Sequence, residues 1–409
     1  MHKFSSYLAE EKNVHMEHIE DSILNGGVEG ARQAINYLRS LRDMLAGSSK
    51  SSVKVTVKWD GAPAIFAGKD PSDGKFFVAK KGVFNKNPKV YKTNADIDAD
   101  TDGDLNTKLK EALKYLPALG IEGVVQGDFL YSKKDIKKVD IDGESYITFH
   151  PNTIVYAIPA KSELAKTILA SNIGVVWHTV YRGATFDQMS ASFGEEIASD
   201  LKKSKNVWAV DASYKDASGT ATFNKKETDK ITRILSDAGK LFKKVKPATM
   251  NTISDNAEFL IRMKGFINVK VKAGEKIKNP NTFVKEMVDW MYDYYQKEID
   301  KLKTERGKKG KEAKRKEIMS YFSNTPKSQI VEMFKMYNLL VDAKHMIIAK
   351  LDKAKRIGTF LQTADGYRVT PQEGFVAIDR FGKNAVKLVD RMQFSQANFS
   401  PEFIKGWQK

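Results

Sequence analysis

The spacing of apolar residues changes twice along the chain, and this change constrains the fold more than any other feature. In residues 51–186, and again after residue 366, apolar residues alternate or form short runs between turn residues, as in β-strands. In residues 187–365 they recur every three or four positions, which predicts helices. We therefore expect an α+β protein whose core of antiparallel sheets is built from both flanks, with residues 187–365 as a large helical insertion domain.

Residues 1–50 form an N-terminal helical segment ahead of this core in the predicted organisation. Its clearest part is residues 28–46, which place Ala31, Ile35 and Leu38 on one stripe before Gly47. The core is expected in two parts, 51–186 and 366–409, with a closing hairpin at 374–378 and 384–389. We expect two polar stretches, 91–107 and 301–316, to be solvated connections, and we assign His15 and His18 no role.

Composition excludes several classes of protein. With no cysteine, the chain has no disulfide, thiolate nucleophile or cysteine-bound zinc. No apolar run approaches the roughly 18 residues of a membrane span, and residues 1–6 do not begin an apolar signal. We therefore expect no membrane partner and a cytoplasmic location.

The positive charge lies in one segment. Residues 201–360 hold 36 Lys and Arg against 19 Asp and Glu, a net +17 that equals the charge of the whole chain. The remaining residues, 32 against 32, are neutral. Lysines on solvated helices would also give basic clusters, but the confinement of the excess favours a surface for nucleic acid.

One tetrapeptide, Lys58-Trp59-Asp60-Gly61, places chemistry at the end of a predicted strand. Alternation with Val53, Val55 and Val57 puts Lys58 on the face opposite the core, and Asp60 returns to the face of Lys58. Gly61 lets the backbone turn tightly and lets a ligand approach. We expect an amine and a carboxylate at the lip of a cleft.

This tetrapeptide resembles the Lys-x-Asp-Gly motif of the covalent nucleotidyltransferases, the superfamily of ATP-dependent DNA ligases, RNA ligases and mRNA capping enzymes. Further segments resemble later motifs of that superfamily in the same order: Ala79–Gly82, Val125–Phe129, Val175–His178, Glu373–Val376 and Val386–Val389. The first 190 residues also resemble an uncharacterised family encoded by tailed bacteriophages. The resemblance therefore implies a ligase adenylation-domain-like core, in the host cytoplasm if a phage encodes it.

The resemblance implies ATP, Mg²⁺ or Mn²⁺, and a covalent lysine–AMP intermediate on Lys58. Asp60 would orient that lysine, which must be uncharged to attack, and basic neighbours at Lys81 and Lys387 would lower its pKa. The implied catalytic residues are Lys58, Asp60, Glu373 and Lys387. Residues implied to contact the nucleotide are Trp59, Gly61, Lys81, Asp128, Phe149 and Lys387. The metal would be held by Glu373 and Asp128.

The implied reaction passes AMP to a 5′-phosphate and seals the strand on RNA or nicked duplex bound by residues 201–360. Only 20 residues follow Val389, too few for the OB domain of DNA ligases, so an RNA ligase is favoured and a monomer expected. The last motif has Val389 where a second lysine is usual, and Arg391 or Lys383 are candidate substitutes. Two alternatives stay open: a degenerate ligase fold that binds nucleic acid or builds a phage structure, and an end-modifying or capping nucleotidyltransferase.

Overall fold

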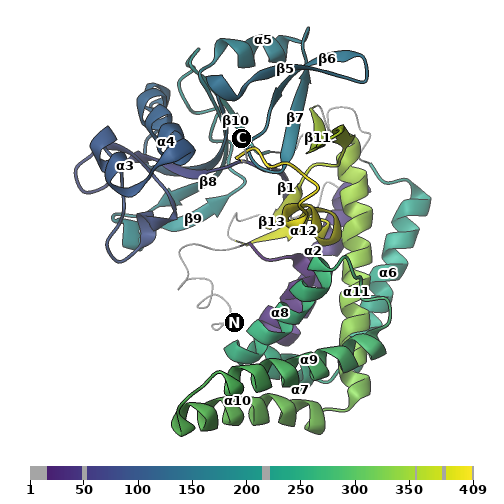
Figure 1. The fold of residues 1–409 in the computed structure, drawn as a ribbon. Helices are drawn as coiled ribbons and strands as arrows, with labels where there is room; N and C mark the ends of the chain where they lie inside the picture. The colour runs from purple at the N-terminus through teal and green to yellow at the C-terminus, as the bar shows by residue number, and fades with distance from the viewer. Residues whose placement is uncertain (1–15, 48–52, 214–221, 355–356, 380–383, 408–409) are drawn as a thin grey trace.

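The chain folds into a β-rich part and a helical part that meet along one three-stranded sheet (Figure 1). This computed structural model describes residues 16–47, 53–213, 222–354, 357–379 and 384–407. The α+β class predicted from the spacing of apolar residues is confirmed. Within the described ranges no helix is long and apolar enough to cross a membrane.

The strands of the described residues form three sheets that are antiparallel except for the pairing of β10 with β8. The largest has the order β10-β8-β4-β2-β3, with β9 beside β8: β2 (Ala64–Lys69), β3 (Phe76–Ala79), β4 (Val124–Ser132), β8 (Ile173–Arg182), β9 (Ser190–Phe193) and β10 (Val207–Asp211). The second has the order β12-β11-β7-β6-β5: β5 (Lys137–Ile141), β6 (Glu144–Phe149), β7 (Ile154–Pro159), β11 (Gly358–Thr363) and β12 (Gly366–Val369).

The third sheet joins the two flanks of the sequence. Strand β1 (Val53–Lys58) pairs along its whole length with β13 (Gly374–Asp379), which pairs in turn with β14 (Ala385–Leu388). The predicted closing hairpin and its return to the N-terminal strands are confirmed. All the helices of the basic segment lie between these two flanks in the sequence.

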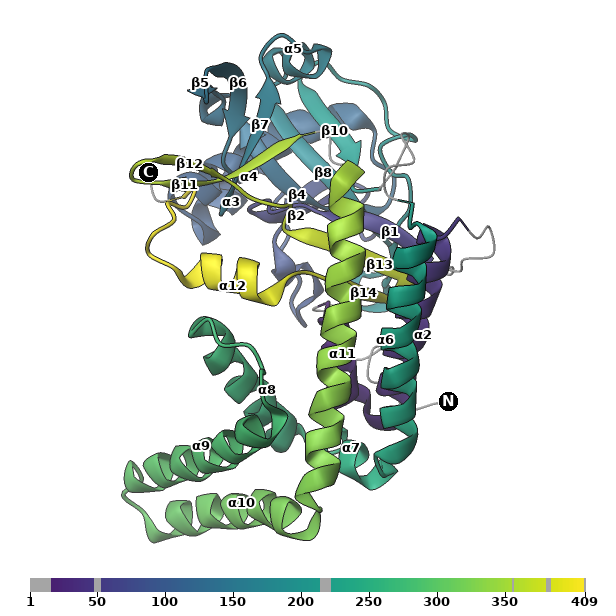
Figure 2. The same ribbon diagram turned by 90° about the vertical axis from the view of Figure 1, so that its right-hand side faces the viewer.

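Helices α2 and α6 to α11 gather at one end of the molecule, whereas α3, α4 and α5 lie in the β-rich part. Helix α11 runs from the third sheet down to the hairpin of α9 and α10, with α2 and α6 beside its upper half (Figure 2). The bounds of the helices are α2 (Ser22–Leu45), α3 (Asn94–Asp100), α4 (Gly103–Tyr115), α5 (Glu163–Ala170), α6 (Lys225–Lys244), α7 (Pro247–Ser254), α8 (Ala257–Lys272), α9 (Pro280–Asp300), α10 (Glu305–Asn324), α11 (Lys327–Leu351) and α12 (Arg391–Phe399).

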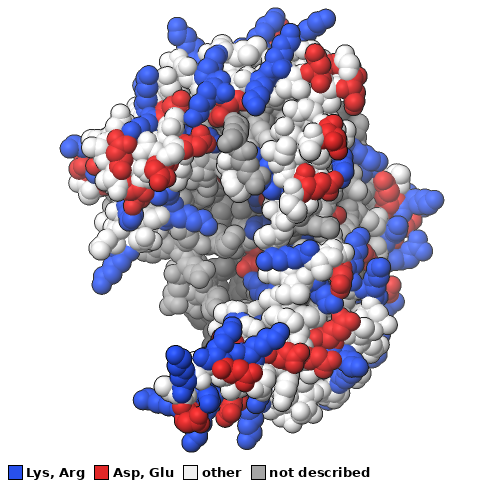
Figure 3. Space-filling view, viewed as in Figure 1, with Lys and Arg blue, Asp and Glu red and all other residues white. Residues whose placement is uncertain are grey.

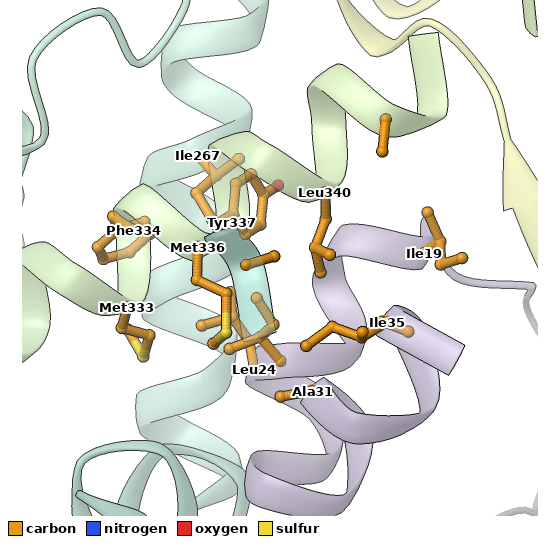
Figure 4. Close-up of a cluster of buried hydrophobic side chains, with 14 of the residues drawn as sticks. Ile19, Leu24, Ala31, Ile35, Ile267, Met333, Phe334, Met336, Tyr337 and Leu340 are labelled. Atoms are coloured by element: carbon orange, nitrogen blue, oxygen red, sulfur yellow. The ribbon is translucent and has the colours of Figure 1, made fainter. Parts of the chain in front are cut away.

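One hydrophobic core holds the helical part to the third sheet. The stripe predicted on residues 28–46 is buried on α2 and packs with residues of α6 to α11, and Phe375 and Leu388 of the sheet belong to the same cluster. Figure 4 shows Leu24, Ala31 and Ile35 facing Met336 and Leu340 of α11. Helix α2, predicted as a separate N-terminal segment, therefore packs within the helical part.

Three predictions of local structure were wrong. Residues 91–107 contain α3 and the start of α4 instead of a solvated loop, because Thr93 and Asp96 form a capping box that begins α3. Residues 305–324 form α10, which Thr304 caps by accepting a hydrogen bond from the backbone N–H of Gly307. The segment predicted as helical also includes β9, β10 and β11, which are too short to show a clear alternation.

Candidate functional site

Lys58 ends β1 directly opposite the point where β13 begins. Its backbone pairs with Gly374, and its Nζ donates a hydrogen bond of 2.6 Å to Oε1 of Glu373. Gly374 has φ +152°, a conformation that favours glycine, and a β-carbon there would lie 2.4 Å from the carbonyl oxygen of Leu388. This backbone conformation turns Glu373 out of the strand and toward the lysine.

The loop after Lys58 lies against β4. The backbone N–H of Ala62 donates to the carbonyl of Phe129, and that of Phe129 donates to Pro63. A β-carbon on Gly61 would lie 2.4 Å from the β-carbon of Asp128. Gly61, which we predicted to let a ligand approach, instead allows close packing against strand β4. This packing brings Asp128 beside Lys58.

Asp60 has a different role from the one expected. Its buried carboxylate accepts three hydrogen bonds of 2.7 Å, from the side chain of Asn152 and from the backbone N–H groups of Thr153 and Ile154. Both carboxylate oxygens hold the 152–154 turn, so the contacts of Asp60 do not support the prediction that it orients Lys58, although its charge helps to raise the pKa of that amine. Glu373 is the residue that binds the amine.

A cavity of ≈ 190 Å³ contains Lys58 and most of the expected residues. Those that line it are Lys58, Trp59, Lys81, Asp128 and Lys387. Phe149 does not line it, because its ring is buried between those of Tyr131 and Tyr156, with centroids 4.8 and 5.4 Å away. Its predicted role in contacting the nucleotide is therefore not supported by its position.

The charge state of Lys58 also differs from the expectation. Burial lowers its pKa, but Glu373 and Asp128 more than offset this, so the pKa is raised above the ordinary value. The pKa of Lys387 is instead lowered, by burial and by the charge of Lys58. In the protein without substrate, Lys58 is a paired ammonium, because its Nζ lies 2.6 Å from Oε1 of Glu373 and the charge of Asp128 also favours the protonated form.

Two carboxyl groups that act on Lys58, those of Asp128 and Glu373, have raised pKa values. Burial raises the pKa of Asp128 to about 7, with Glu373 and Asp60 adding to the effect against the opposing charge of Lys58. Burial likewise raises the pKa of Glu373, against the opposing effect of Lys58. Asp128 is therefore able to accept a proton near neutral pH, and the pKa of Glu373 is shifted in the same direction.

Several cavity residues were missed by the sequence analysis. His178 lies with its Nε2 3.9 Å from Asp128, and burial lowers the pKa of this histidine to about 4. Gln126 and Tyr181 line the same cavity, and the tyrosine hydroxyl donates to the glutamine at 2.8 Å. The regular alternation of β4 and β8 would place these side chains, but a register shift at Gln126 and Gly127 breaks it.

A short N-terminal segment borders the cavity on the side of β14. The backbone N–H of Lys387 donates to the carbonyl of Glu17 at 2.9 Å, and His18 forms a parallel bridge with Lys387. His18, to which we assign no role from the sequence, is thus a one-residue extension of the third sheet. No sequence pattern predicts this pairing, because a single bridging residue has no periodicity.

The proposed replacement for the missing second lysine is not in the cavity. Arg391 makes two hydrogen bonds to the buried carboxylate of Asp21, at 2.8 and 2.9 Å, and so faces the helical part. Lys383, the other candidate, lies outside the described residues. Val389 is buried in the core of the β-rich part.

The donor set suits a metal that brings most of its own ligands. Within the described ranges, no group of three or more acidic or histidine side chains is placed to hold an ion alone. Glu373 accepts a hydrogen bond from Lys58, and the charge of Asp128 acts on the same amine. Magnesium commonly takes one or two carboxylates together with phosphate and water oxygens, so this pair fits it.

Comparison with known proteins places the chain in a family. Residues 13–402 match the model described as "Family of unknown function (DUF6267)", and the chain belongs to that family. No curated protein and no solved structure shows significant similarity to it.

Proposed function

We propose that this protein is an ATP-dependent polynucleotide ligase, with RNA favoured over nicked DNA, that works through a covalent AMP adduct on Lys58. The observation that carries the proposal is that Lys58, Asp128 and Lys387, from β1, β4 and β14, line one cavity, while Glu373, just before β13, accepts a hydrogen bond from Lys58. Glu373 is 315 positions from Lys58 in the chain. An ordinary surface lysine would not gather these partners from distant strands.

The chemistry begins with proton transfer from Lys58. Its ammonium gives a proton to Glu373, which already accepts its hydrogen bond, and the amine attacks the α-phosphorus of ATP. A nitrogen–phosphorus bond forms while the bond to the bridging oxygen breaks, and pyrophosphate leaves with that electron pair. The nitrogen then loses its second proton, for which Asp128, with its pKa of about 7, is the available acceptor.

Two cations stabilise the phosphates in this proposal. Lys387 and Lys81 line the same cavity as Lys58, where they would neutralise charge on the non-bridging oxygens. Magnesium held by Asp128, Glu373 and the phosphates would supply further neutralisation.

The polynucleotide would bind along the basic helices. Lys and Arg side chains project from the lower end of the molecule, where α9 and α10 form a hairpin (Figure 3). Several lysines of α10 are paired, as Lys308 is with Glu305. Arg306, Lys309 and Lys316 have no acidic partner among the described residues, so they can contact phosphates without breaking an ion pair.

The test is transfer of label to protein that has first been stripped of bound AMP with pyrophosphate. With α-labelled ATP and magnesium, we expect labelled wild-type protein after denaturing electrophoresis and none for Lys58→Ala. Lys54→Ala is the matched control, because Lys54 is exposed on the same strand and lies outside the cavity. Competition by GTP instead of ATP would indicate a capping-type enzyme, and no label on wild type would refute the adduct.

A second candidate function is favoured by one observation. The raised pKa of Lys58 keeps its amine charged and paired, as expected of a ligase fold that binds nucleic acid without catalysis. In that case the protein would retain oligonucleotide binding, measured by fluorescence anisotropy, while no label is transferred.

A further inference from the structure

A second and larger cavity lies in the helical part. It has a volume of ≈ 300 Å³ and is bounded by α8, the loop from 273 to 279, α9, α11 and the first residues of α12. In the described part of the chain, no residue lines both this cavity and the one at Lys58. We call it the helical pocket.

The walls of the helical pocket are mainly apolar. Ile267 and Val271 come from α8, Phe283 from α9, Val341 from α11 and Met392 from α12. Its volume is at the lower limit of the roughly 300–1,000 Å³ usual for small-molecule sites. An occupant must therefore have a compact apolar body, and a long acyl chain or a folded peptide is too large.

Most cations of the pocket are already paired. Lys344 binds Glu20 at 2.7 Å, and Lys270 binds Glu275 at 2.7 Å and Glu286 at 2.8 Å. Arg391 is held by Asp21. These groups shape the wall, but a ligand would have to break a buried ion pair to use them.

Two lysines at the rim are available. Lys276 and Lys278 are exposed on the 273–279 loop, and neither has an acidic partner among the residues that the structure describes. The loop is fixed, because the side chain of Asn338 on α11 donates to the carbonyl of Ile277 at 2.7 Å. The backbone that carries the two lysines is thus anchored at the mouth of the pocket.

Polar groups complete the pocket. Asp342 is an exposed carboxylate at the rim with no described cationic partner, and it is an acceptor for a hydroxyl or amino group. His345 faces the pocket with its Nε2 3.7 Å from Asp390. A ligand that fits must bear an anionic group, a compact ring and hydrogen-bond donors.

We propose that the helical pocket binds a nucleotide, with its base against the apolar walls, its phosphate at Lys276 and Lys278, and its sugar hydroxyls toward Asp342. Inorganic phosphate lacks the apolar body, and a fatty acid lacks donors for Asp342. The nucleotide has two sources, a free mononucleotide or the terminal nucleotide of a strand. The site does not depend on catalysis at Lys58.

Methionine methyl groups report on the two cavities separately. Met392 lines the helical pocket and Met16 lines the cavity at Lys58. We would label the methyl carbons of the full chain, assign these two signals with Met392→Leu and Met16→Leu, and titrate with AMP, with 5′-phosphorylated tetraadenylate and with inorganic phosphate. We expect a saturable shift of the Met392 signal with at least one nucleotide probe.

The response to the three probes identifies the source. A shift with AMP alone indicates a free nucleotide, and a shift with the oligonucleotide alone indicates a strand end. The double variant Lys276→Glu/Lys278→Glu should weaken binding at Met392 by about tenfold or more, because two phosphate contacts are lost. Lys285→Glu, on the exposed side of α9 and outside the pocket, should not.

Three results would overturn the proposal. They are an unshifted Met392 signal with both nucleotides, an affinity unchanged in the double variant, or inorganic phosphate binding as tightly as AMP. A shift of Met16 without one of Met392 would leave the Lys58 site supported and the helical pocket refuted, so the two proposals fail separately.

Discussion

The buried carboxyl of Asp128 should make the stability of the protein depend on pH in a way that one substitution removes. Its pKa is about 7 in the folded protein, against an ordinary value of 3.8. A carboxyl whose pKa is raised by folding stabilises the protein fully below pH 3.8, and this stability is lost as the pH rises through 7. Between pH 5 and pH 8, linkage for these two values gives a loss of about 2–3 kcal/mol.

Asp128→Asn keeps the size of the side chain and removes the titration. We expect the free energy of unfolding of the wild type to fall by about 2–3 kcal/mol more than that of the variant between pH 5 and pH 8. Urea unfolding of both proteins at both pH values measures this difference. Subtracting the change in the variant from the change in the wild type cancels the titrating groups that the substitution leaves unaffected. Equal pH dependence in the two proteins would refute the raised pKa, and with it the role of Asp128 as a proton acceptor.

Three further substitutions test the surroundings of the site. Glu373→Gln should lower the pKa of the Lys58 amine by removing its strongest anionic neighbour, as read by NMR of the dimethylated amine; an unchanged pKa would contradict the pairing. Gly61→Ala should destabilise the fold by about 1–3 kcal/mol because the new methyl group meets β4, while Gly310→Ala, in open space on α10, should stabilise it by up to about 1 kcal/mol; thermal or urea unfolding compares them, and equal effects would refute the close packing. Asp21→Asn should cost about 3–5 kcal/mol by leaving a buried guanidinium unpaired, and a loss below 1 kcal/mol in urea unfolding would count against it.

The sequence predicted the strands that carry the site because their alternation survives in the fold. Val53 and Val55 are buried and Lys54 is exposed on β1, as their spacing required. The order of motifs also predicted which strand ends would meet, and Glu373 does lie beside Lys58. Alternation is visible within a single strand and motif order is visible along the chain, so both can be read without coordinates.

The rest depended on contacts that no local pattern encodes. The sequence indicated that Asp60 orients the lysine. In the fold its carboxylate instead accepts hydrogen bonds from the 152–154 turn, some 90 residues later in the chain. The direction of the pKa shift of Lys58 was predicted wrongly for the same reason, since it depends on which charged groups the fold brings close to the amine. Helix α10 was missed because its dense lysines and two glycines hide the few apolar residues, Ile318 and Tyr321, that are buried.

The pairing of β1 with β13 determines when the third sheet can form during synthesis of the chain. Lys58 leaves the ribosome 315 residues ahead of the carboxylate that binds it. At roughly 5–20 residues per second, translation takes about 15–60 s to cover that distance. Throughout that interval β1 has no partner from the closing hairpin, and the lysine acquires its ion pair only after Glu373 has been made.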